Sequence, residues 1–548
     1  MPELDQELAH TIEDLITQSY TVYDKENLEP SLTLLKKAWD LLPPSKVNWQ
    51  ESYYISKNII HIYLEANNLE KTKTYLPTFI TCDNLNRNYG ESEFLAGKIA
   101  FDTGKETEAL NYFVIAGHKG GSRIFNGSEN AKYKDFYKKH PNTADKTKAY
   151  KASLKPQKIS VNTKTLLAND YTVFRQLEHP DSGKICIIAH QEQEVLVELG
   201  KPDKTKITGK KFPSKDAASL HWKKKEVELL KKGFIYKNQT ANLGAATMHR
   251  FIGSGYTGAL SFEPTTEGIY VSKVCWDNNT AKDAIKDALV LIDEAGLLID
   301  TINLPKALPW DICYNATQHL LYIYLDKCIY EYNIVTKVML PLTKIDDLEH
   351  KRVTSTKNVL AFSTKNDLKF TNNLLTIHEG LFDFLVSRDN PSFAFQLSPD
   401  GQLLAVQQQA QVINIMNTQT GFTTMTLDIN TAAVGQIEIS PDNKILTFID
   451  HGADYWRIRF FSLETQKELF FEEIKLPPHE YLFYFCYNAT HSKLVLNYRT
   501  NALVFDFQEK IFLHEFQFEH SIKKGSIKFV GELLGVRTDY GFFSLYKV

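Results

Sequence analysis

The feature that most constrains the fold is an internal repeat in the C-terminal half of the chain. The segment LSPDG at 397–401 precedes an apolar run, and ISPDN at 439–443 precedes a similar run about 42 residues later. The pentapeptide CYNAT occupies the same place twice, at 313–317 and 486–490. Weaker copies of the turn begin at Ser261, Ser355 and Phe529. These turns divide this half into seven units, and a hairpin-like pair of apolar runs follows each of the stronger turns.

Seven units of four short strands resemble a β-propeller of the WD-repeat type. The Gly-His and Trp-Asp landmarks of true WD repeats are missing, so the resemblance implies a WD-like, seven-bladed propeller over residues 239–548, with six or eight blades as alternative counts. The last unit has room for three strands only. We expect residues 234–252 to supply the missing strand and close the ring, which would remove an exposed edge. A helical-looking insertion at Thr280–Ala288 accounts for the longer first spacing.

The N-terminal third has the apolar spacing of amphipathic helices. The apolar stripes form three pairs, with turns at Asn27, Asn68 and Lys105. Small residues recur seven apart in the second helix of a pair: Ser31 with Ala38, and Ala109 with Ala116. This pattern resembles the tetratricopeptide repeat, a helix pair that stacks into an α-solenoid. We assign residues 1–140 to such a solenoid; a generic helical bundle is the alternative, and both predict a concave, non-catalytic surface.

A basic segment lies between the helices and the repeats. Residues 132–237 carry 24 Lys and Arg against 12 Asp and Glu, whereas the whole chain has a net charge of −3. Residues 141–160 combine lysines with turn-forming residues and are predicted to be a solvated linker. Residues 161–238 have the pattern of strands, a Lys/Gly-rich turn and one helix, which Ser214 caps and Gly233 ends. The chain is therefore predicted to be multidomain α + β, with a small α+β module in its middle.

The order of elements in this module resembles the WGR module of poly(ADP-ribose) polymerases and of many bacterial proteins. That family runs a strand into Trp-Gly-Arg and continues with a turn, a Phe and a helix; here Leu199, Gly200 and Lys201 hold the motif position. In the polymerases the module packs at a DNA end through the flat Trp ring and the Arg fork, and Leu199 and Lys201 offer neither. Gly200 is kept, which indicates a turn that needs its backbone. The resemblance therefore implies the fold, whereas DNA-end recognition and polymerase activity do not carry over.

Lysines around this motif are the candidate anion or nucleic-acid contacts. They are Lys201, Lys204, Lys206, Lys210 and Lys211. Lysines bind a phosphate backbone through charge without reading sequence, so these five could hold DNA or RNA. The alternative is an ordinary solvated face, or a surface that docks on the acidic parts of the same chain.

The sequence gives no sign of a known catalytic or metal-binding motif. No P-loop, GxSxG, HExxH or EF-hand pattern occurs, and Gly253–Gly258 does not open a helix. Asp400 and Asp442 are expected to cap their own turns. We therefore expect no enzyme, no cofactor, no metal and no small-molecule substrate. A propeller enzyme would need a convergent polar cluster in the channel of the ring.

Composition favours a protein of the cytoplasm. The six cysteines are scattered without a CxxC pair, which indicates reduced thiols. The N-terminal stretch MPELDQELAHTIEDL is acidic and polar, and no apolar run is long enough to span a membrane. We expect neither a signal peptide nor a membrane partner.

These features together predict a non-catalytic protein that binds other macromolecules, above all proteins. Chains that combine helical repeats, WGR-like modules and propeller repeats resemble bacterial proteins encoded beside contact-delivered toxins. By that resemblance, the sharpest hypothesis is an immunity protein that neutralises a cognate toxin inside the cell. The alternative is a nucleic-acid-associated factor that uses the basic middle segment.

Overall fold

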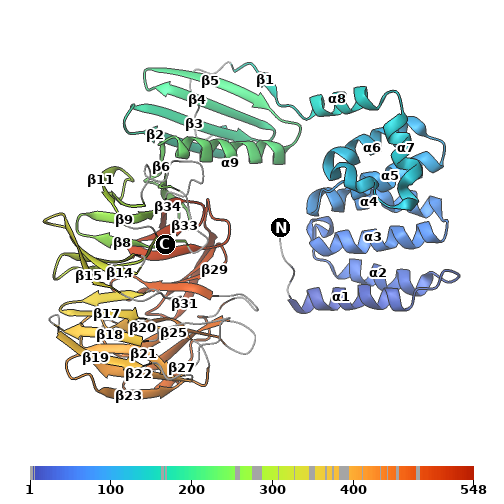
Figure 1. The fold of residues 1–548 in the computed structure, drawn as a ribbon. Coiled ribbons are helices and arrows are strands. Elements are labelled where there is room, and N and C mark those ends of the chain that lie inside the picture. Colours follow the sequence, from blue (N-terminus) through green and yellow to red (C-terminus); the bar gives the residue numbers. More distant parts are fainter. Residues whose placement is uncertain are drawn as a thin grey trace. The chain divides into compact units, whose positions relative to one another are not determined.

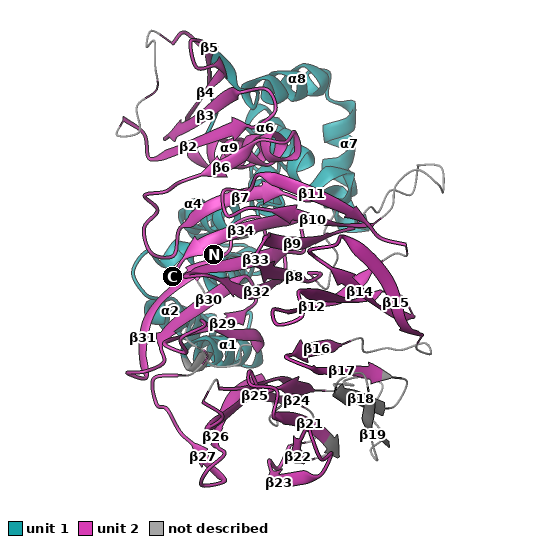
Figure 2. Ribbon diagram, turned by 90° about the vertical axis from the view of Figure 1, so that its left-hand side faces the viewer, with its two compact units in different colours: residues 1–158, 211–214 teal, residues 159–210, 215–548 magenta. Residues whose placement is uncertain are grey.

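The computed structural model (Figure 1) describes residues 4, 6–161, 166, 170–253, 259–274, 287–305, 308–325, 327–344, 352–364, 367–372, 375–381, 394–409, 411–431, 434–440, 442–451, 456–474, 476 and 482–548. The chain divides into two compact units (Figure 2). Unit 1 comprises residues 1–158 and 211–214, and unit 2 comprises residues 159–210 and 215–548. None of the helices in these described stretches is long and apolar enough to cross a membrane.

Unit 1 contains the three predicted helix pairs. They are α1 (Gln6–Thr21) with α2 (Glu29–Leu41), α3 (Gln50–Glu65) with α4 (Leu69–Asn86), and α5 (Glu91–Asp102) with α6 (Glu106–Gly120). Successive helices pack on one another through the unit (Figure 1). At the second turn, the Asn68 side chain accepts a hydrogen bond from the Lys71 amide at 3.1 Å and so caps α4. The paired helices agree with the sequence pattern, and membership of the tetratricopeptide family stays a prediction.

Small residues set the distance between these helices. The four predicted contact residues are all buried: Ser31, Ala38, Ala109 and Ala116. Gly97 on α5 is closer still to α6, because a Cβ atom at Gly97 would lie 2.6 Å from the Phe113 ring. The sequence pattern therefore identified the positions where backbones approach, although it missed Gly97.

The predicted linker at 141–160 is largely helical. After α7 (Ala131–Lys139), residues Thr143–Ser153 form α8, which contains no buried residue. Lys146 on α8 donates a hydrogen bond to Asn111 at 2.7 Å, and Tyr150 packs edge-to-face against His118. The lysines that suggested a solvated connection are thus on an exposed helix, which keeps their charges in water.

The α+β module belongs to unit 2 except for residues 157–158 and 211–214. Its strands are β1 (Gln157–Ile159), β2 (Val173–His179), β3 (Lys184–Gln191), β4 (Glu194–Lys201), β5 (Lys204–Lys211) and β6 (Ile235–Lys237). The single helix α9 (Lys215–Lys231) packs on β3 and β4. It begins after Ser214 and ends before Gly233, as predicted, and its side chains Ala218, Trp222 and Leu229 are buried. The structure has the predicted mix of strands and one helix, and the WGR assignment stays a prediction.

The rest of unit 2 consists of short antiparallel sheets arranged as a β-propeller (Figure 1). Six of them have four strands each. They are β8 (Phe262–Thr265), β9 (Gly268–Lys273), β10 (Ala288–Ile292), β11 (Leu298–Asn303); β12 (Pro309–Asn315), β13 (Leu320–Leu325), β14 (Cys328–Asn333), β15 (Val338–Lys344); β16 (Val353–Thr356), β17 (Val359–Thr364), β18 (Asp367–Asn372), β19 (Leu375–Leu381); β20 (Phe395–Leu397), β21 (Leu403–Gln409), β22 (Val412–Asn417), β23 (Thr423–Asp428); β24 (Val434–Ile439), β25 (Ile445–His451), β26 (Trp456–Ser462), β27 (Lys467–Leu469); and β28 (Leu482–Tyr487), β29 (Lys493–Tyr498), β30 (Asn501–Asp506), β31 (Ile511–Gln517).

The last strands close the ring in the predicted way. These are β32 (Gly525–Val530), β33 (Leu533–Thr538) and β34 (Phe542–Lys547). The strand β7 (Ala246–Phe251), within the predicted 234–252 segment, pairs antiparallel with β34. Since β6 joins β7 to β2, the sheet runs on into the module as a ten-stranded sheet in the order β1-β5-β4-β3-β2-β6-β7-β34-β33-β32. The expectation of seven separate four-stranded blades is therefore wrong: six such sheets stand alone, and the last strands share a sheet with the module.

Repeated residues build the core and the turns of these sheets. The second residue of the second strand is buried in sheet after sheet: Ile269, Leu321, Leu360, Leu404, Leu446, Leu494 and Leu534. At the SPD turns, Asp400 accepts a hydrogen bond from the Gln402 amide at 3.0 Å and Asp442 from the Lys444 amide at 3.1 Å, which confirms that the two aspartates cap their own turns. The insertion predicted at Thr280–Ala288 lies almost wholly outside the described residues.

Candidate functional site

The propeller contains a central cavity of about 660 Å³. Its walls come from the first strand of each repeat: β8, β12, β16, β20, β24, β28 and β32. The residue two positions before a capped turn faces this cavity in four repeats, as Cys313, Gln396, Glu438 and Cys486. The repeat thus directs the side chain at one fixed position of several sheets into the central cavity.

Polar side chains join neighbouring strands around this cavity. Glu263 on β8 accepts a hydrogen bond from the Tyr314 amide at 3.2 Å, and Asp311 on β12 accepts one from the Val353 amide at 3.0 Å. Gln436 on β24 exchanges hydrogen bonds of 2.7 and 3.1 Å with the backbone of Phe485 on β28. Each of these side chains therefore forms a hydrogen bond with a backbone group of the adjacent sheet and also lines the cavity.

The cavity also holds a buried ion pair. Lys528 on β32 donates to the Glu263 carboxylate on β8, across the point where the ring closes. Burial by itself lowers the pKa of Lys528, but Glu263 and Asp311 more than offset this, so its pKa lies above the ordinary value. Burial likewise raises the pKa of both carboxyls, although Lys528 opposes the shift. The Lys528 side chain keeps 38% of its surface open to the cavity, so water still reaches the pair.

Glu438 on β24 is the carboxyl without such a partner. No hydrogen bond or ion pair joins its side chain to another described residue, and burial raises its pKa to about 8, with Lys528 opposing the shift. The half-buried aromatic residues Trp310, Tyr484 and Phe529 line the same cavity. A carboxylate among aromatic rings is an environment that favours an organic cation, through ionic and cation–π contacts.

The two cysteines of this cavity have strongly raised thiol pKa values. Burial raises the pKa of the Cys313 thiol to about 12 and that of Cys486 well above its usual range, so both stay protonated and unreactive. Lys528 remains charged and paired. Among the described residues that line the cavity, no nucleophile lies within hydrogen-bond distance of a general base. The convergent polar cluster that sequence analysis named as the condition for an enzyme is present, but it lacks this pairing.

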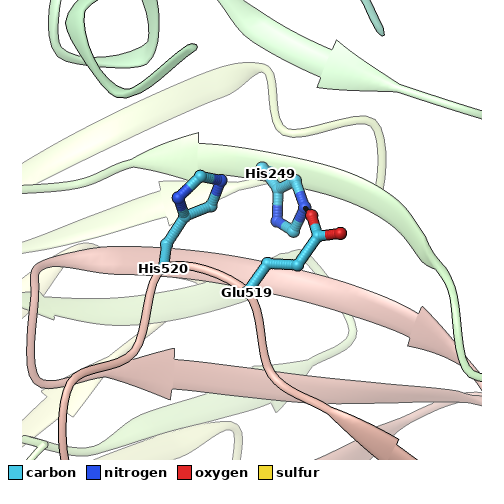
Figure 3. Close-up of side chains that lie close together, drawn as sticks. All are labelled: His249, Glu519 and His520. Carbon is cyan, nitrogen blue, oxygen red and sulfur yellow. Dashed lines mark hydrogen bonds and ion pairs between the residues drawn. The ribbon is translucent and has the colours of Figure 1, made fainter. Parts of the chain in front are cut away.

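A second polar cluster lies where the module's sheet meets the propeller within unit 2. It consists of His249 on β7 with Glu519 and His520 on the connection from β31 to β32 (Figure 3). His249 Nε2 lies 2.6 Å from Glu519 Oε2, and its Nδ1 lies 2.7 Å from Ser544 Oγ. The ring of His520 meets that of His249 edge-to-face at a centroid distance of 4.8 Å. No local sequence pattern predicts this cluster, because His249 lies about 270 residues before Glu519 and His520 in the chain.

Two residues of the module complete this environment. Arg175 on β2 donates to Glu519 Oε1 at 2.5 Å and also lies 3.6 Å from Glu226 on α9. Burial raises the pKa of Glu519, but hydrogen bonding by His249 and the charges of His249 and Arg175 lower it well below its usual range. Burial raises the pKa of Glu226, against the attraction of Arg175. The cluster therefore combines one carboxylate that is held ionised with another that is poorly compensated.

The five predicted lysines all project into solvent. Lys201 ends β4, Lys204, Lys206, Lys210 and Lys211 lie on β5, and all five are exposed. Alternation along a strand puts Lys204, Lys206 and Lys210 on one face of β5 and Lys211 on the other. No ion pair joins any of them to an acidic residue in the described part of the chain. The structure thus brings three of the five together.

The motif position shows why glycine is kept there. Leu199 is 40% exposed and belongs to no described aromatic or ionic contact. A Cβ atom at Gly200 would lie 2.3 Å from the Lys204 carbonyl oxygen, so the hairpin from β4 to β5 leaves room for glycine only.

Unit 1 has a groove of its own, with a volume of about 730 Å³. It is lined by side chains of α3 to α6 and of the turns that follow, including Tyr89, Lys98, Lys119 and Arg123. Tyr89 is 66% exposed, and Lys119 is paired with Glu93 at 2.5 Å. The groove therefore mixes an exposed ring with partly neutralised charge.

A ring of antiparallel sheets closed by a strand from earlier in the chain defines a β-propeller protein. Among solved structures, the chain is similar to the β-propeller domain of Myceliophteria thermophila Cps50 (Swd1), with 9% identity and a TM-score of 0.42, over 55% of this chain and 99% of that one. It is also similar to a chain in the mitotic checkpoint complex, with 10% identity and a TM-score of 0.44, over 57% of this chain and 94% of that one. The sequence matches no protein-family model and no curated protein.

Proposed function

We propose that this protein is a non-catalytic binding protein whose propeller takes up a cationic side chain of a partner protein in its central cavity. The observation that carries the proposal is Glu438, a carboxyl that faces the cavity without a partner among the described residues. Buried carboxyls are normally paired, and a group left open in a cavity favours a ligand that supplies the missing charge.

The charges of the cavity favour a cation over an anion. With Glu438 protonated, Glu263 and Asp311 balance Lys528 and Arg352. Ionisation of Glu438 therefore adds one negative charge for which the described residues of the cavity offer no free cation, since Lys528 already has its partner in Glu263. An incoming guanidinium or ammonium group would restore the balance and ionise Glu438. Binding would therefore release a proton near neutral pH and strengthen as pH rises.

The test is affinity capture from cells of the source organism with three forms of the full chain. Wild type and the control Glu464→Gln should recover the same partner, because Glu464 is an exposed residue in the turn between β26 and β27. Glu438→Gln should lose that partner, since it removes the charge and keeps the side-chain volume. Equal recovery by Glu438→Gln and wild type would exclude the cavity as the binding site.

The hypothesis of an immunity protein is a more specific form of the same proposal, in which the partner is a toxin. It is based on the resemblance of the domain order to bacterial proteins encoded beside toxins. If it is correct, the captured partner is toxic when expressed alone, and co-expression of wild type but not of Glu438→Gln restores growth. A partner without toxicity would reject this form and leave cation binding intact.

A second candidate function is the binding of a nucleic-acid backbone by the lysines of β5. The observation in its favour is that Lys204, Lys206 and Lys210 are exposed on one face without acidic partners among the described residues. Replacement of all three by Gln should weaken binding of duplex DNA or RNA and reduce its salt dependence by up to about three phosphate contacts. A control with Lys36, Lys37 and Lys73 changed to Gln should bind as wild type does. Absence of salt-sensitive binding by the wild-type chain would reject this function.

A further inference from the structure

The cluster around His249 contains two buried polar atoms that have no hydrogen-bond partner. These are Nε2 of His520, whose side chain is 8% exposed, and Oε1 of Glu226, whose side chain is 2% exposed. Their nearest charged partners are too far for a hydrogen bond, with Arg175 Nε 3.6 Å from Glu226 Oε1 and Glu226 Oε2 3.5 Å from His520 Nε2. Buried polar atoms without a hydrogen bond cost free energy. Both atoms belong to residue types that bind metal ions.

The same site gathers further metal-binding atoms. One ligand atom each from His249, Glu519 and His520 lies within 4.8 Å of the others (Figure 3). Glu226 Oε2 lies 3.5 Å from His520 Nε2. Two imidazole nitrogens and one carboxylate oxygen therefore converge from β7 and from the connection between β31 and β32, and a carboxylate oxygen of α9 lies beside one of them, Nε2 of His520.

We propose that these four side chains bind one zinc ion, through Nε2 of His249, Nε2 of His520 and one carboxylate oxygen each of Glu519 and Glu226. Zinc bound by nitrogen and oxygen has bond lengths of about 2.0 to 2.2 Å and tetrahedral geometry, so neighbouring ligand atoms are about 3.3 Å apart. The 3.5 Å between His520 and Glu226 fits this separation. The pair of His249 and Glu519 stands at a hydrogen-bond distance of 2.6 Å and opens by less than an ångström to admit the ion.

The residues that contact these ligands can orient them for a metal ion. Ser544 contacts His249 Nδ1, and because a hydroxyl both donates and accepts, it can hold His249 in the tautomer that binds zinc through Nε2. Arg175 bonds to Glu519 Oε1 and leaves Oε2 for the ion. The Glu519 side chain is 37% exposed, which gives the ion a way in although His249 is fully buried.

The ion would tie the module to the propeller within unit 2. Four protein ligands leave no open position, which is typical of a structural zinc site. The ligands come from three elements that are far apart in the chain, so bound zinc would stabilise the folded unit by linking α9 to β7 and to the connection before β32.

The test uses the full chain after treatment with a chelator. Wild type should take up about one zinc ion per chain, measured by elemental analysis after gel filtration, and its thermal midpoint should rise. His520→Gln and Glu226→Gln should each lose most of the zinc, whereas the control His514→Gln, a half-buried histidine on β31 outside the cluster, should keep it. Uptake by wild type that both variants retain would overturn the proposal, as would no stoichiometric uptake.

A second measurement covers variants that fail to fold. Cobalt(II) in place of zinc on the wild-type chain should give the intense visible absorption of a tetrahedral site with nitrogen and oxygen ligands. The weak spectrum of six-coordinate cobalt would overturn the proposal without any variant.

Discussion

Replacing Glu438 by Gln is predicted to remove a pH-dependent loss of stability from the propeller. Burial raises the pKa of this carboxyl from 4.5 to about 8, so the folded chain keeps a proton that the unfolded chain has already lost. Because the folded pKa is the higher one, the stabilisation is complete below the unfolded pKa and disappears as pH rises through the folded value.

The magnitude follows from the two pKa values. Between them, the free energy of unfolding falls by about 1.4 kcal/mol per pH unit for one such group. The whole interval limits the effect to about 5 kcal/mol, and access of water through the open cavity reduces it to roughly 2 or 3 kcal/mol. Glutamine has no proton to lose. The free energy of unfolding of Glu438→Gln, relative to wild type, should therefore rise from about pH 5 to pH 8 and level off above about pH 9.

Urea denaturation followed by tryptophan fluorescence measures this difference, since the propeller contains Trp310 and Trp456 and urea carries no charge that could bind Glu438. The control Glu464→Gln changes an exposed carboxyl and should run parallel to wild type at every pH. If Glu438→Gln also runs parallel to wild type, the carboxyl has an ordinary pKa and the argument from an unpaired carboxyl in the cavity fails.

Three further predictions concern stability and thiol reactivity. Gly97→Val should destabilise unit 1 by about 1 to 3 kcal/mol, because its side chain would collide with the Phe113 ring, and an unchanged thermal midpoint would contradict this packing. Arg459→Met should cost about 1.5 to 3 kcal/mol in urea unfolding, since it removes a 2.8 Å bond from the fully buried Asp450 carboxylate and leaves Arg457 as the remaining cation; a loss below about 0.5 kcal/mol would contradict it. Cys313 should resist iodoacetamide in the folded chain near neutral pH because burial raises its pKa to about 12, and rapid labelling located there by mass spectrometry would be inconsistent with that environment.

The sequence was most informative where a local pattern repeats. The SPD turns predicted the positions of the sheets, because Ser and Asp side chains stabilise the same turn each time. The last unit has room for only three strands, and this predicted that an earlier segment, which contains β7, supplies the fourth. Helix pairs followed from apolar spacing for the same reason. The lysines at 141–160 misled, because a helix with no buried face leaves no apolar stripe to detect.

The candidate sites depend on contacts that no local pattern records. Glu438 occupies a repeat position that holds the neutral residues Cys313, Gln396 and Cys486 in other sheets. The acidic residue at this position could therefore have been singled out from the aligned repeats. The cluster of His249 with Glu226 and His520 has no such pattern, because α9, β7 and the connection before β32 are separate segments that only the tertiary fold brings together. Long-range closure of this kind is decided by the tertiary packing.

The most direct test of the proposed function is the affinity of the wild-type chain for N-acetyl-L-argininamide as a function of pH, with the citrulline analogue as the uncharged control. Arginine keeps its charge across this range, so a carboxyl with a pKa of about 8 predicts affinity about tenfold higher at pH 9 than at pH 7, and no such rise for Glu438→Gln. Equal affinities at the two pH values, or equal binding of the citrulline analogue, would contradict cation binding by the propeller.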